Sequence, residues 1–186
     1  MKANKVNVWQ VLKHYLPPQF LEDISLEVIY RICGILDANS FRVDKHGSRG
    51  LYLALSMVNH DCLPNARVVF NSEGRVSLLA KKTIKKGQPI SITYCSLLLN
   101  TPSRLTKLKS SKFFTCLCDL CHDPSERKTY LSALICPKGC KGLLLPHSFY
   151  ESSPDWKCNA CTFVTCDEKV QKLVEAVRVS CLALNR

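Results

Sequence analysis

The stretch NHDCLPN (residues 59–65) places a histidine, an aspartate, a cysteine and two asparagines between two apolar segments. LYLALSMV (51–58) precedes it and ARVVF (66–70) follows it. Polar residues and proline are common in surface turns, so an ordinary turn is one interpretation. The density of side chains that bind metals or cofactors supports a second interpretation, in which the stretch belongs to a functional site.

The chain has 186 residues, of which 46% are hydrophobic. This composition predicts a folded protein with one sizeable core, or one domain with a small satellite. No apolar run approaches the ~20 residues that span a bilayer, and the N-terminus lacks the apolar block of a signal peptide. The sequence therefore predicts an intracellular protein, cytoplasmic and/or nuclear, in which twelve cysteines indicate metal binding or reactivity rather than disulfides.

Hydrophobic periodicity and turn residues predict a helical lead-in, a β-rich middle, a cysteine-rich region and a final helix. Helices are expected at 7–16 and 21–36, from a cap at Thr101 to Phe114, and from Asp167 onward; strands are expected at 51–55, 66–70, 75–80 and 89–94, with a hairpin loop at 71–74.

The first cysteine group is CLCDLC, which contains Cys116, Cys118 and Cys121. Three thiolates at this spacing can face one ion, but zinc takes four ligands at tetrahedral corners. The fourth ligand must come from His122 or from elsewhere in the chain.

The second group consists of two close pairs, Cys136 with Cys140 and Cys158 with Cys161. Two such pairs in sequence are typical of a zinc ribbon, although the first pair is C-x3-C rather than C-x2-C. Cys166 is a substitute ligand if Cys140 does not reach the ion. A region with so little core needs the folding energy that zinc supplies.

The formal net charge is +11. A zinc ion with four thiolates carries −2, so two such sites would lower the charge to about +7. A basic surface suits acidic partners or nucleic acid, but no basic motif with interleaved aromatic residues is present. We therefore expect a solvated Lys/Arg surface and no direct nucleic-acid binding.

Three motifs in order, NHDCLPN, GQPISITY (87–94) and FTCLCDLC (114–121), resemble the SMYD group of SET-domain protein-lysine methyltransferases. The family patterns are N-H-S-C-x-P-N, G-x-x-[IL]-x-[IL]-x-Y and F-x-C-x-C-x-x-C. DPSERKTYLSALIC (123–136) and WKCNAC (156–161) resemble the arthropod SMYD subgroup that includes the msta-like proteins. The resemblance covers roughly residues 21–166.

The resemblance implies an α+β fold, with the C-terminal part of a β-rich SET-type core, a helical insert, a cysteine-rich zinc-bound post-SET region and a C-terminal helix. The implied segments are a helical lead-in (1–50), the SET core (51–112), the post-SET zinc region (113–130), a zinc-ribbon-like module (131–166) and the start of a C-terminal helical region (167–186). The implied cofactors are S-adenosyl-L-methionine and two zinc ions. The implied partners are a protein with a target lysine, on a histone or another protein, and further protein partners.

The resemblance also implies a role for the opening stretch, which in SET domains threads beneath a neighbouring loop. Cys62 matches the remote fourth ligand of the zinc ion held by Cys116, Cys118 and Cys121. Tyr94 matches the tyrosine at the methyl-transfer centre. The positions that match cofactor-contacting residues are Asn39, Ser56, Asn59, His60 and Phe114. The residue types suit the chemistry, because Phe114 offers a flat face to adenine and Tyr94 can orient reacting groups without acting as a conventional base.

The sequence departs from the family pattern at three places. No G-x-G segment precedes Val6, so half of the cofactor pocket and the MYND zinc module are expected to lie outside this sequence, which is then a fragment, an isoform or a degenerate member. Asp61 replaces a serine, and Lys112 replaces a tyrosine of the lysine channel. We therefore expect weak or no activity from this chain alone. The alternative is a non-enzymatic, zinc-scaffolded interaction module resembling a transcriptional regulator.

Overall fold

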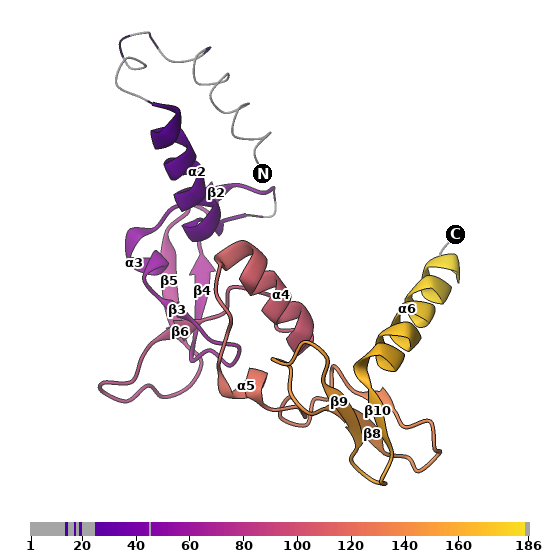
Figure 1. The fold of residues 1–186 in the computed structure, drawn as a ribbon. Coiled ribbons are helices and arrows are strands. Elements are labelled where there is room, and N and C mark those ends of the chain that lie inside the picture. The colour runs from indigo at the N-terminus through magenta and orange to yellow at the C-terminus, as the bar shows by residue number, and fades with distance from the viewer. Residues whose placement is uncertain (1–13, 15–16, 18, 20–24, 45, 185–186) are drawn as a thin grey trace. The chain divides into compact units, whose positions relative to one another are not determined.

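The computed structural model describes residues 14, 17, 19, 25–44 and 46–184, and there the chain forms helices and short strands (Figure 1). It confirms the mixed α+β class. The described chain divides into two compact units: unit 1 contains residues up to Asn59 and Asn65–Ile92, and unit 2 contains His60–Pro64 and the residues from Thr93 onward. The helix expected at 7–16 lies outside the described residues, apart from His14.

In the part of unit 1 that the structure describes, the chain forms two helices, of which the second is a single turn, and short antiparallel ribbons. Its elements are α2 (Leu26–Asn39), β1 (Phe41–Arg42), β2 (Arg49–Gly50), α3 (Leu53–Ser56), β4 (Ala66–Phe70), β5 (Val76–Ala80) and β6 (Ser91–Ile92). Strand β1 pairs with β2 and β4 pairs with β5. Strand β3 (Asn59–His60), where the chain passes from unit 1 to unit 2, pairs with β6.

The β4–β5 hairpin confirms the expected strands at 66–70 and 75–80, in the register Ala66↔Ala80 to Phe70↔Val76. Its turn is set by Asn71, whose side-chain oxygen accepts hydrogen bonds from the backbone N–H of Glu73 (3.1 Å) and of Arg75 (2.8 Å). Gly74 completes the turn with φ of 75°, a conformation that glycine adopts without steric cost.

Of the expected strands, the one at 51–55 is wrong and the one at 89–94 is shorter than predicted. Residues 53–56 form the helical turn α3 instead of a strand, and Ser56 Oγ donates to the carbonyl of Tyr52 (2.8 Å). The hydrophobic pattern of a short apolar run fits both a strand and a buried helical turn, so it cannot distinguish them. The strand expected at 89–94 is reduced to β6, because Thr93 Oγ1 donates to the carbonyl of Cys95 (2.6 Å) and turns the chain.

Unit 2 contains the cysteine-rich region and three helices. Its elements are α4 (Thr101–Lys112), α5 (Asp119–His122), β7 (Leu134–Ile135), β8 (Leu143–Pro146), β9 (Asp155–Cys158), β10 (Val164–Cys166) and α6 (Asp167–Leu184). The last four strands form one antiparallel sheet in the order β10-β9-β8-β7, and α6 (yellow in Figure 1) continues directly from β10.

Helix α4 begins one residue earlier than the sequence predicts. Asn100, rather than Thr101, is the N-cap, and its side chain accepts a hydrogen bond from Ser103 N–H (3.1 Å). Thr101 is thereby the first helical residue. The helix ends at Lys112, since Phe113 has a left-handed backbone with φ of 62°.

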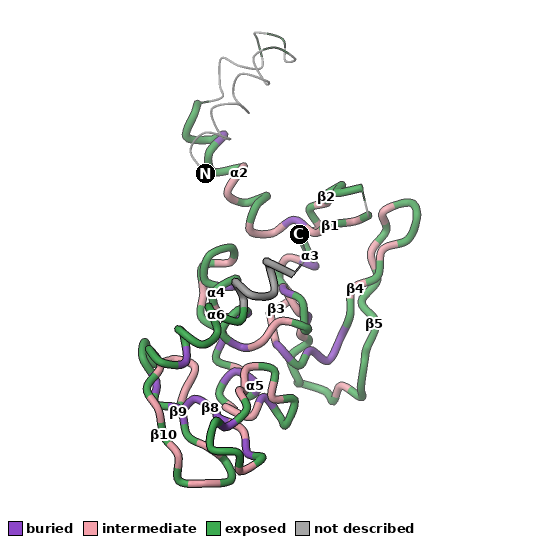
Figure 2. Tube along the Cα trace, turned by 90° about the vertical axis from the view of Figure 1, so that its right-hand side faces the viewer, coloured by how far each residue is buried: buried purple, intermediate pink, exposed green. Residues whose placement is uncertain are grey.

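Buried positions of unit 2 lie on α4, on α5 and on the β8–β9 pair, and Figure 2 shows them along the last two. One cluster contains Cys62, Cys95, Leu108, Cys116, Leu120 and Cys121, and a second contains Leu144, Trp156 and Val170. Trp156 Nε1 donates to Asp167 at the start of α6 (2.9 Å), which fixes that helix on the sheet. Within the described residues, no helix is sufficiently long and apolar to cross a bilayer.

Candidate functional site

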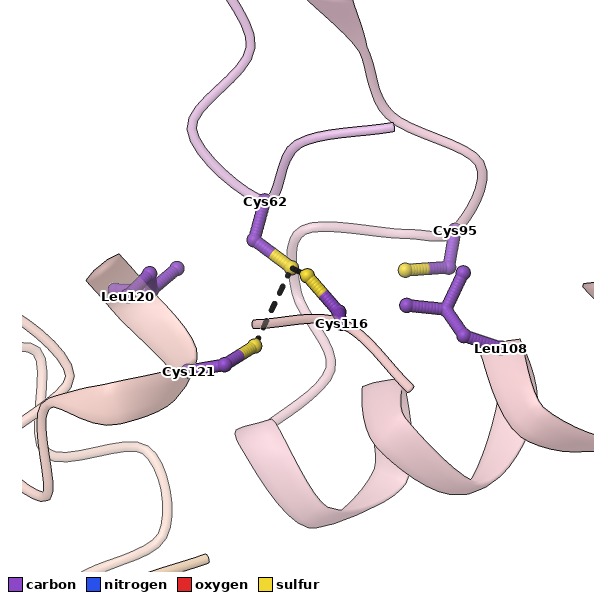
Figure 3. Packing of buried hydrophobic residues seen from close by; sticks show 6 residues of the cluster. All are labelled: Cys62, Cys95, Leu108, Cys116, Leu120 and Cys121. Carbon is purple, nitrogen blue, oxygen red and sulfur yellow. Dashed lines mark hydrogen bonds between the residues drawn. The ribbon is translucent and has the colours of Figure 1, made fainter. Parts of the chain in front are cut away.

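Four cysteine sulfurs of unit 2 converge in the first buried cluster, which we name the first cage: Cys62, Cys116, Cys118 and Cys121. Their Sγ atoms all lie within 4.8 Å of one another, with Cys62 at 3.6 Å from Cys121 and 4.0 Å from Cys116 (Figure 3). A tetrahedral zinc ion with Zn–S bonds of about 2.3 Å requires S···S separations of roughly 3.8 Å. The four thiols therefore fit one zinc ion.

The first cage is shaped by a single helical turn and by the cysteine contributed from the NHDCLPN stretch. Cys118 is the N-cap of α5, and its carbonyl accepts hydrogen bonds from Cys121 N–H (3.0 Å) and His122 N–H (3.1 Å). The carbonyl of Cys116 accepts one from Tyr150 OH (2.7 Å). These bonds hold the later three cysteines around Cys62, which is 1% exposed.

His122, the alternative fourth ligand, does not join the first cage. Its ring lies 4.8 Å from the ring of Tyr150 between centroids, and its Nδ1 lies 3.2 Å from the Cys118 carbonyl. Cys62 takes the fourth position instead, as the family resemblance implied. The assignment of these four residues as zinc ligands stays a prediction.

The thiols of the first cage shift one another's pKa values through their contacts. Contact with Cys118 raises the pKa of Cys62 far above its usual value, whereas contact with Cys121 and Cys62 lowers that of Cys118. A dication of suitable size would favour the thiolate forms, which burial otherwise disfavours.

A second set of four sulfurs, which we name the second cage, lies in the β7–β10 region and contains Cys136, Cys140, Cys158 and Cys161. The Cys136–Cys161 and Cys140–Cys158 sulfurs are 3.8 Å and 3.5 Å apart. These separations also fit one zinc ion. The backbone N–H of Ala160 bonds Cys158 Sγ (3.4 Å) and lowers the pKa of Cys158 to about 7. Cys166 is exposed in β10 and is not part of this cage.

The second cage tolerates a C-x3-C pair because glycines surround it. Gly139 has φ of 69° and allows the turn that joins Cys136 to Cys140. At Gly142, a Cβ atom would lie 2.6 Å from Cys158 Sγ and 2.6 Å from Ala160 Cβ. Only a glycine leaves room for the sulfur at this position.

We therefore expect Gly142→Ala to weaken zinc binding at the second cage. The added methyl group must displace the sulfur of Cys158, and overpacking of this kind costs about 1–3 kcal/mol. Chelator competition should show one weakened and one unchanged zinc ion. Gly34→Ala is the matched control, because a Cβ there meets nothing within 4 Å and alanine stabilises a helix interior by about 0.5–1 kcal/mol. Equal effects of the two substitutions would contradict the packing argument.

Three aromatic residues predicted to belong to the methyl-transfer site, His60, Tyr94 and Phe114, lie together in unit 2. The ring centroids are 5.3 Å apart for His60–Tyr94, 5.9 Å for His60–Phe114 and 6.3 Å for Tyr94–Phe114. The last pair is edge-to-face, a favourable geometry for aromatic rings.

His60 connects this aromatic group to the first cage. Its Nδ1 accepts a hydrogen bond from Tyr94 N–H (3.0 Å), and its Nε2 lies 3.2 Å from Cys62 Sγ. Because Nδ1 is an acceptor, the hydrogen-bond network assigns the ring proton to Nε2, which then donates to the cysteine. A single side chain thus positions both a candidate metal ligand and the backbone of Tyr94.

The ring environment keeps His60 and Tyr94 neutral near pH 7. Burial lowers the pKa of His60 below its usual 6.5, despite the opposing negative charges at Cys118 and Asp61. Burial also raises the pKa of Tyr94 above 10. The tyrosine hydroxyl is therefore protonated, and it can orient a reacting group by hydrogen bonding but does not serve as a base at neutral pH.

The other residues of the opening stretch make local contacts. Asp61 accepts a hydrogen bond from Leu63 N–H (2.6 Å), so this carboxylate stabilises the turn. Within unit 1, buried Asn65 accepts from Ser91 N–H (2.8 Å) and donates to the Pro89 carbonyl (2.8 Å). The contacts of Asp61 and Asn65 support the turn interpretation. The site interpretation, which rests on His60 and Cys62, stays a prediction.

The remaining predicted cofactor residues, Asn39, Ser56 and Asn59, belong to unit 1. Ser56 Oγ lies 3.4 Å from the Asn39 carbonyl, so these two residues are brought together. The Asn39 side chain donates to the carbonyl of Ile35 (3.0 Å) at the end of α2. Asn59 is exposed in β3. Their role as cofactor contacts stays a prediction.

Sequence reasoning missed Arg104 and Tyr150, which lie next to the first cage, and Glu126, which lies beside Arg104. Arg104 and Glu126 are 1% and 0% exposed. A signal was available for Arg104, because Thr101, Arg104 and Leu108 follow the i, i+3, i+7 spacing of a buried helix face. No comparable signal marks Glu126, which lies in an irregular loop.

The family model of the SET domain matches residues 6–95. The chain therefore carries a SET domain, joined to two cysteine cages that fit zinc.

Similar proteins indicate which type of SET-domain protein the chain is. SET domain-containing protein SmydA-8, isoform A, of Drosophila melanogaster is 38% identical over 157 residues, which cover 80% of this chain and 34% of the relative. Histone-lysine N-methyltransferase Smyd1 of Mus musculus is 30% identical over 141 residues, which cover 67% of this chain and 29% of the relative. Histone-lysine N-methyltransferase SMYD3 of Mus musculus is 31% identical over 106 residues, which cover 57% of this chain and 24% of the relative. The chain is a SET-domain protein of the SMYD type, similar to the arthropod members, and it spans about a third or less of these relatives' lengths.

Proposed function

We propose that this chain is part of a SET-type protein-lysine methyltransferase, which transfers a methyl group from S-adenosyl-L-methionine to a lysine of a histone or another protein. The observation that carries the proposal is His60, which connects Cys62 to the backbone of Tyr94 within a segment matched by the SET domain. Similarity to methyltransferases of this type supports it. A nuclear and/or cytoplasmic location and further protein partners are part of the proposal.

When bound, S-adenosyl-L-methionine supplies an electrophilic methyl group on a sulfonium. Phe114 would present its ring to the adenine, and Asn39, Ser56, Asn59 and His60 would contribute polar contacts. Tyr94 would orient the reacting amine through its protonated hydroxyl, since burial raises the pKa of that hydroxyl. The two cages would each hold one zinc ion and fix the backbone of this region.

Lys112 favours a second candidate function, a non-enzymatic interaction module. Its Nζ lies 5.4 Å from the centroid of the Tyr94 ring. A cation at this distance opposes the approach of a second cation, whether a sulfonium or a substrate lysine. We therefore propose that methyl transfer by this chain alone is weak.

Native mass spectrometry of the purified chain, with and without S-adenosyl-L-methionine, tests both candidates. The proposed enzyme holds two zinc ions and adds one cofactor molecule. A chain that holds two zinc ions but adds no cofactor at millimolar concentration would support the interaction module. A chain without zinc would contradict both.

Phe114→Ala should weaken binding of S-adenosyl-L-methionine. Stacking of a base on an aromatic ring is worth about 1–3 kcal/mol, which corresponds to roughly 5- to 150-fold in affinity. The neighbouring Phe113→Ala is the matched control, because Phe113 is 68% exposed. Calorimetry that gave equal affinities for the two variants would exclude Phe114 from the cofactor site.

A further inference from the structure

Arg104 is a buried cation on the face of α4 that packs against the first cage. Leu108, one helical turn further along the same face, belongs to the same buried cluster as Cys62, Cys116 and Cys121 (Figure 3). Arg104 itself is 1% exposed. A guanidinium is rarely buried this deeply unless negative charge lies nearby.

The hydrogen bonds of the guanidinium account for two of its nitrogens. One terminal nitrogen donates to the Leu99 carbonyl (2.5 Å), and the other donates to Thr101 Oγ1 (2.5 Å). The Nε atom is buried and makes no hydrogen bond of good geometry to any residue in the described part of the chain.

Glu126 is too fully engaged to be the sole counter-charge. Its nearer carboxylate oxygen lies 3.9 Å from the Arg104 nitrogen, beyond hydrogen-bond distance. That oxygen accepts instead from the backbone N–H and the hydroxyl of Thr101, both at 2.6 Å, while the other accepts from Ser132 N–H (2.7 Å). Burial alone would lower the pKa of Arg104, but the neighbouring sulfurs of Cys62 and Cys121 raise it above its usual value.

A four-thiolate zinc site carries −2, and the first cage is surrounded by little solvent, because three of its cysteines are buried. The second cage differs in burial, since Cys140, Cys158 and Cys161 are half-buried. Solvent can therefore stabilise the thiolates of the second cage. The first cage is less exposed to solvent, so a buried cation would contribute more to its stability.

We propose that Arg104 is the outer-shell counter-charge of the first cage, and that its guanidinium positions and neutralises the thiolates of Cys62 and Cys121 when zinc is bound. Loss of such a partner lowers metal affinity 10- to 100-fold in general. The inference rests on zinc binding at the first cage, as in the proposed function, but it does not depend on methyl transfer.

The test compares Arg104→Met with Arg104→Lys. Both variants lose the planar fork and keep a similar stem, but only the lysine keeps the charge. Zinc affinity is measured by chelator competition on the whole chain, with the second cage as internal reference and Cys62→Ser identifying the first. We expect the first cage of Arg104→Met to bind zinc 10- to 100-fold more weakly than that of Arg104→Lys, with the second cage unchanged within twofold.

If Arg104→Met does not fold, the double variant Arg104→Met/Glu126→Gln is used, because it also removes the carboxylate charge that would be left unpaired. It is compared with Glu126→Gln alone, and its first cage should again bind zinc 10- to 100-fold more weakly. First-cage affinities within twofold of each other would overturn the proposal, as would equal weakening of both cages, which indicates a general packing role. A parent chain that binds no zinc at the first cage would instead contradict the proposed function, so the two failures are distinguishable.

Discussion

Replacing Cys62 with serine should reduce the zinc content of the chain from two ions to one. Cys62 is the single cysteine of the first cage that comes from outside the 116–121 segment, and its sulfur lies 3.6 Å from Cys121 Sγ. A hydroxyl is a poor ligand for zinc beside three thiolates. Because zinc binding supplies about 10–16 kcal/mol in small structural sites, losing it should unfold the cage locally.

Native mass spectrometry reports the zinc count, and amide hydrogen exchange should show faster exchange over residues 116–122. Cys166→Ser is the matched control, because Cys166 is an exposed cysteine outside both cages. The control should keep two zinc ions and parental exchange. A Cys62→Ser chain with two tightly bound zinc ions would show that the first cage is completed by another residue.

Replacing Glu126 with alanine should destabilise the protein by about 3–5 kcal/mol, the usual cost of removing one partner of a buried charge pair. The substitution leaves Arg104 without its carboxylate and orphans the hydrogen-bond donors of Thr101 and Ser132. Because the Arg104–Glu126 separation is 3.9 Å, most of the loss should come from the orphaned donors.

Glu126 also secures an unusual backbone. Glu126, Arg127 and Lys128 have φ values of 51°, 54° and 64°, the left-handed region that costs about 1–2 kcal/mol for each residue with a side chain. The contacts of the carboxylate with Thr101 and Ser132 offset this strain. Without them, the loop should relax to a different conformation.

Urea unfolding in zinc-containing buffer measures this loss. Glu73→Ala is the control, because Glu73 pairs with Arg75 on an exposed hairpin turn and should leave the free energy of unfolding unchanged. Equal stability of the Glu126→Ala and Glu73→Ala variants would show that the buried carboxylate of Glu126 contributes nothing to the free energy of unfolding.

The parts of the site that could be predicted from sequence are those whose chemistry is local. Close cysteine pairs such as Cys158 and Cys161 place two thiolates in one turn, so their spacing alone indicates a metal site. Cys62 stands more than fifty residues before Cys116, and only the family resemblance connected it to the later group. The spacing of cysteines in the sequence does not reveal a contact between residues that only folding brings together.

The parts that could not be predicted depend on tertiary contacts. The buried pair of Arg104 and Glu126 joins a helix to a loop, and neither residue type is expected in a core. Three successive left-handed residues without glycine have no sequence signature. Hydrophobic periodicity predicts a strand where the helical turn α3 forms. The hydrogen bond from Ser56 to the Tyr52 carbonyl favours the helical turn, and periodicity does not reveal this bond.

X-ray absorption at the zinc edge of the purified chain tests the central claim most directly, because it counts the atoms bound to the metal. The account predicts two zinc ions per chain, each surrounded by four sulfur atoms at about 2.3 Å, with Cys62 completing the first set. Nitrogen scatterers, as from His122 in place of Cys62, or a single zinc ion per chain would contradict it.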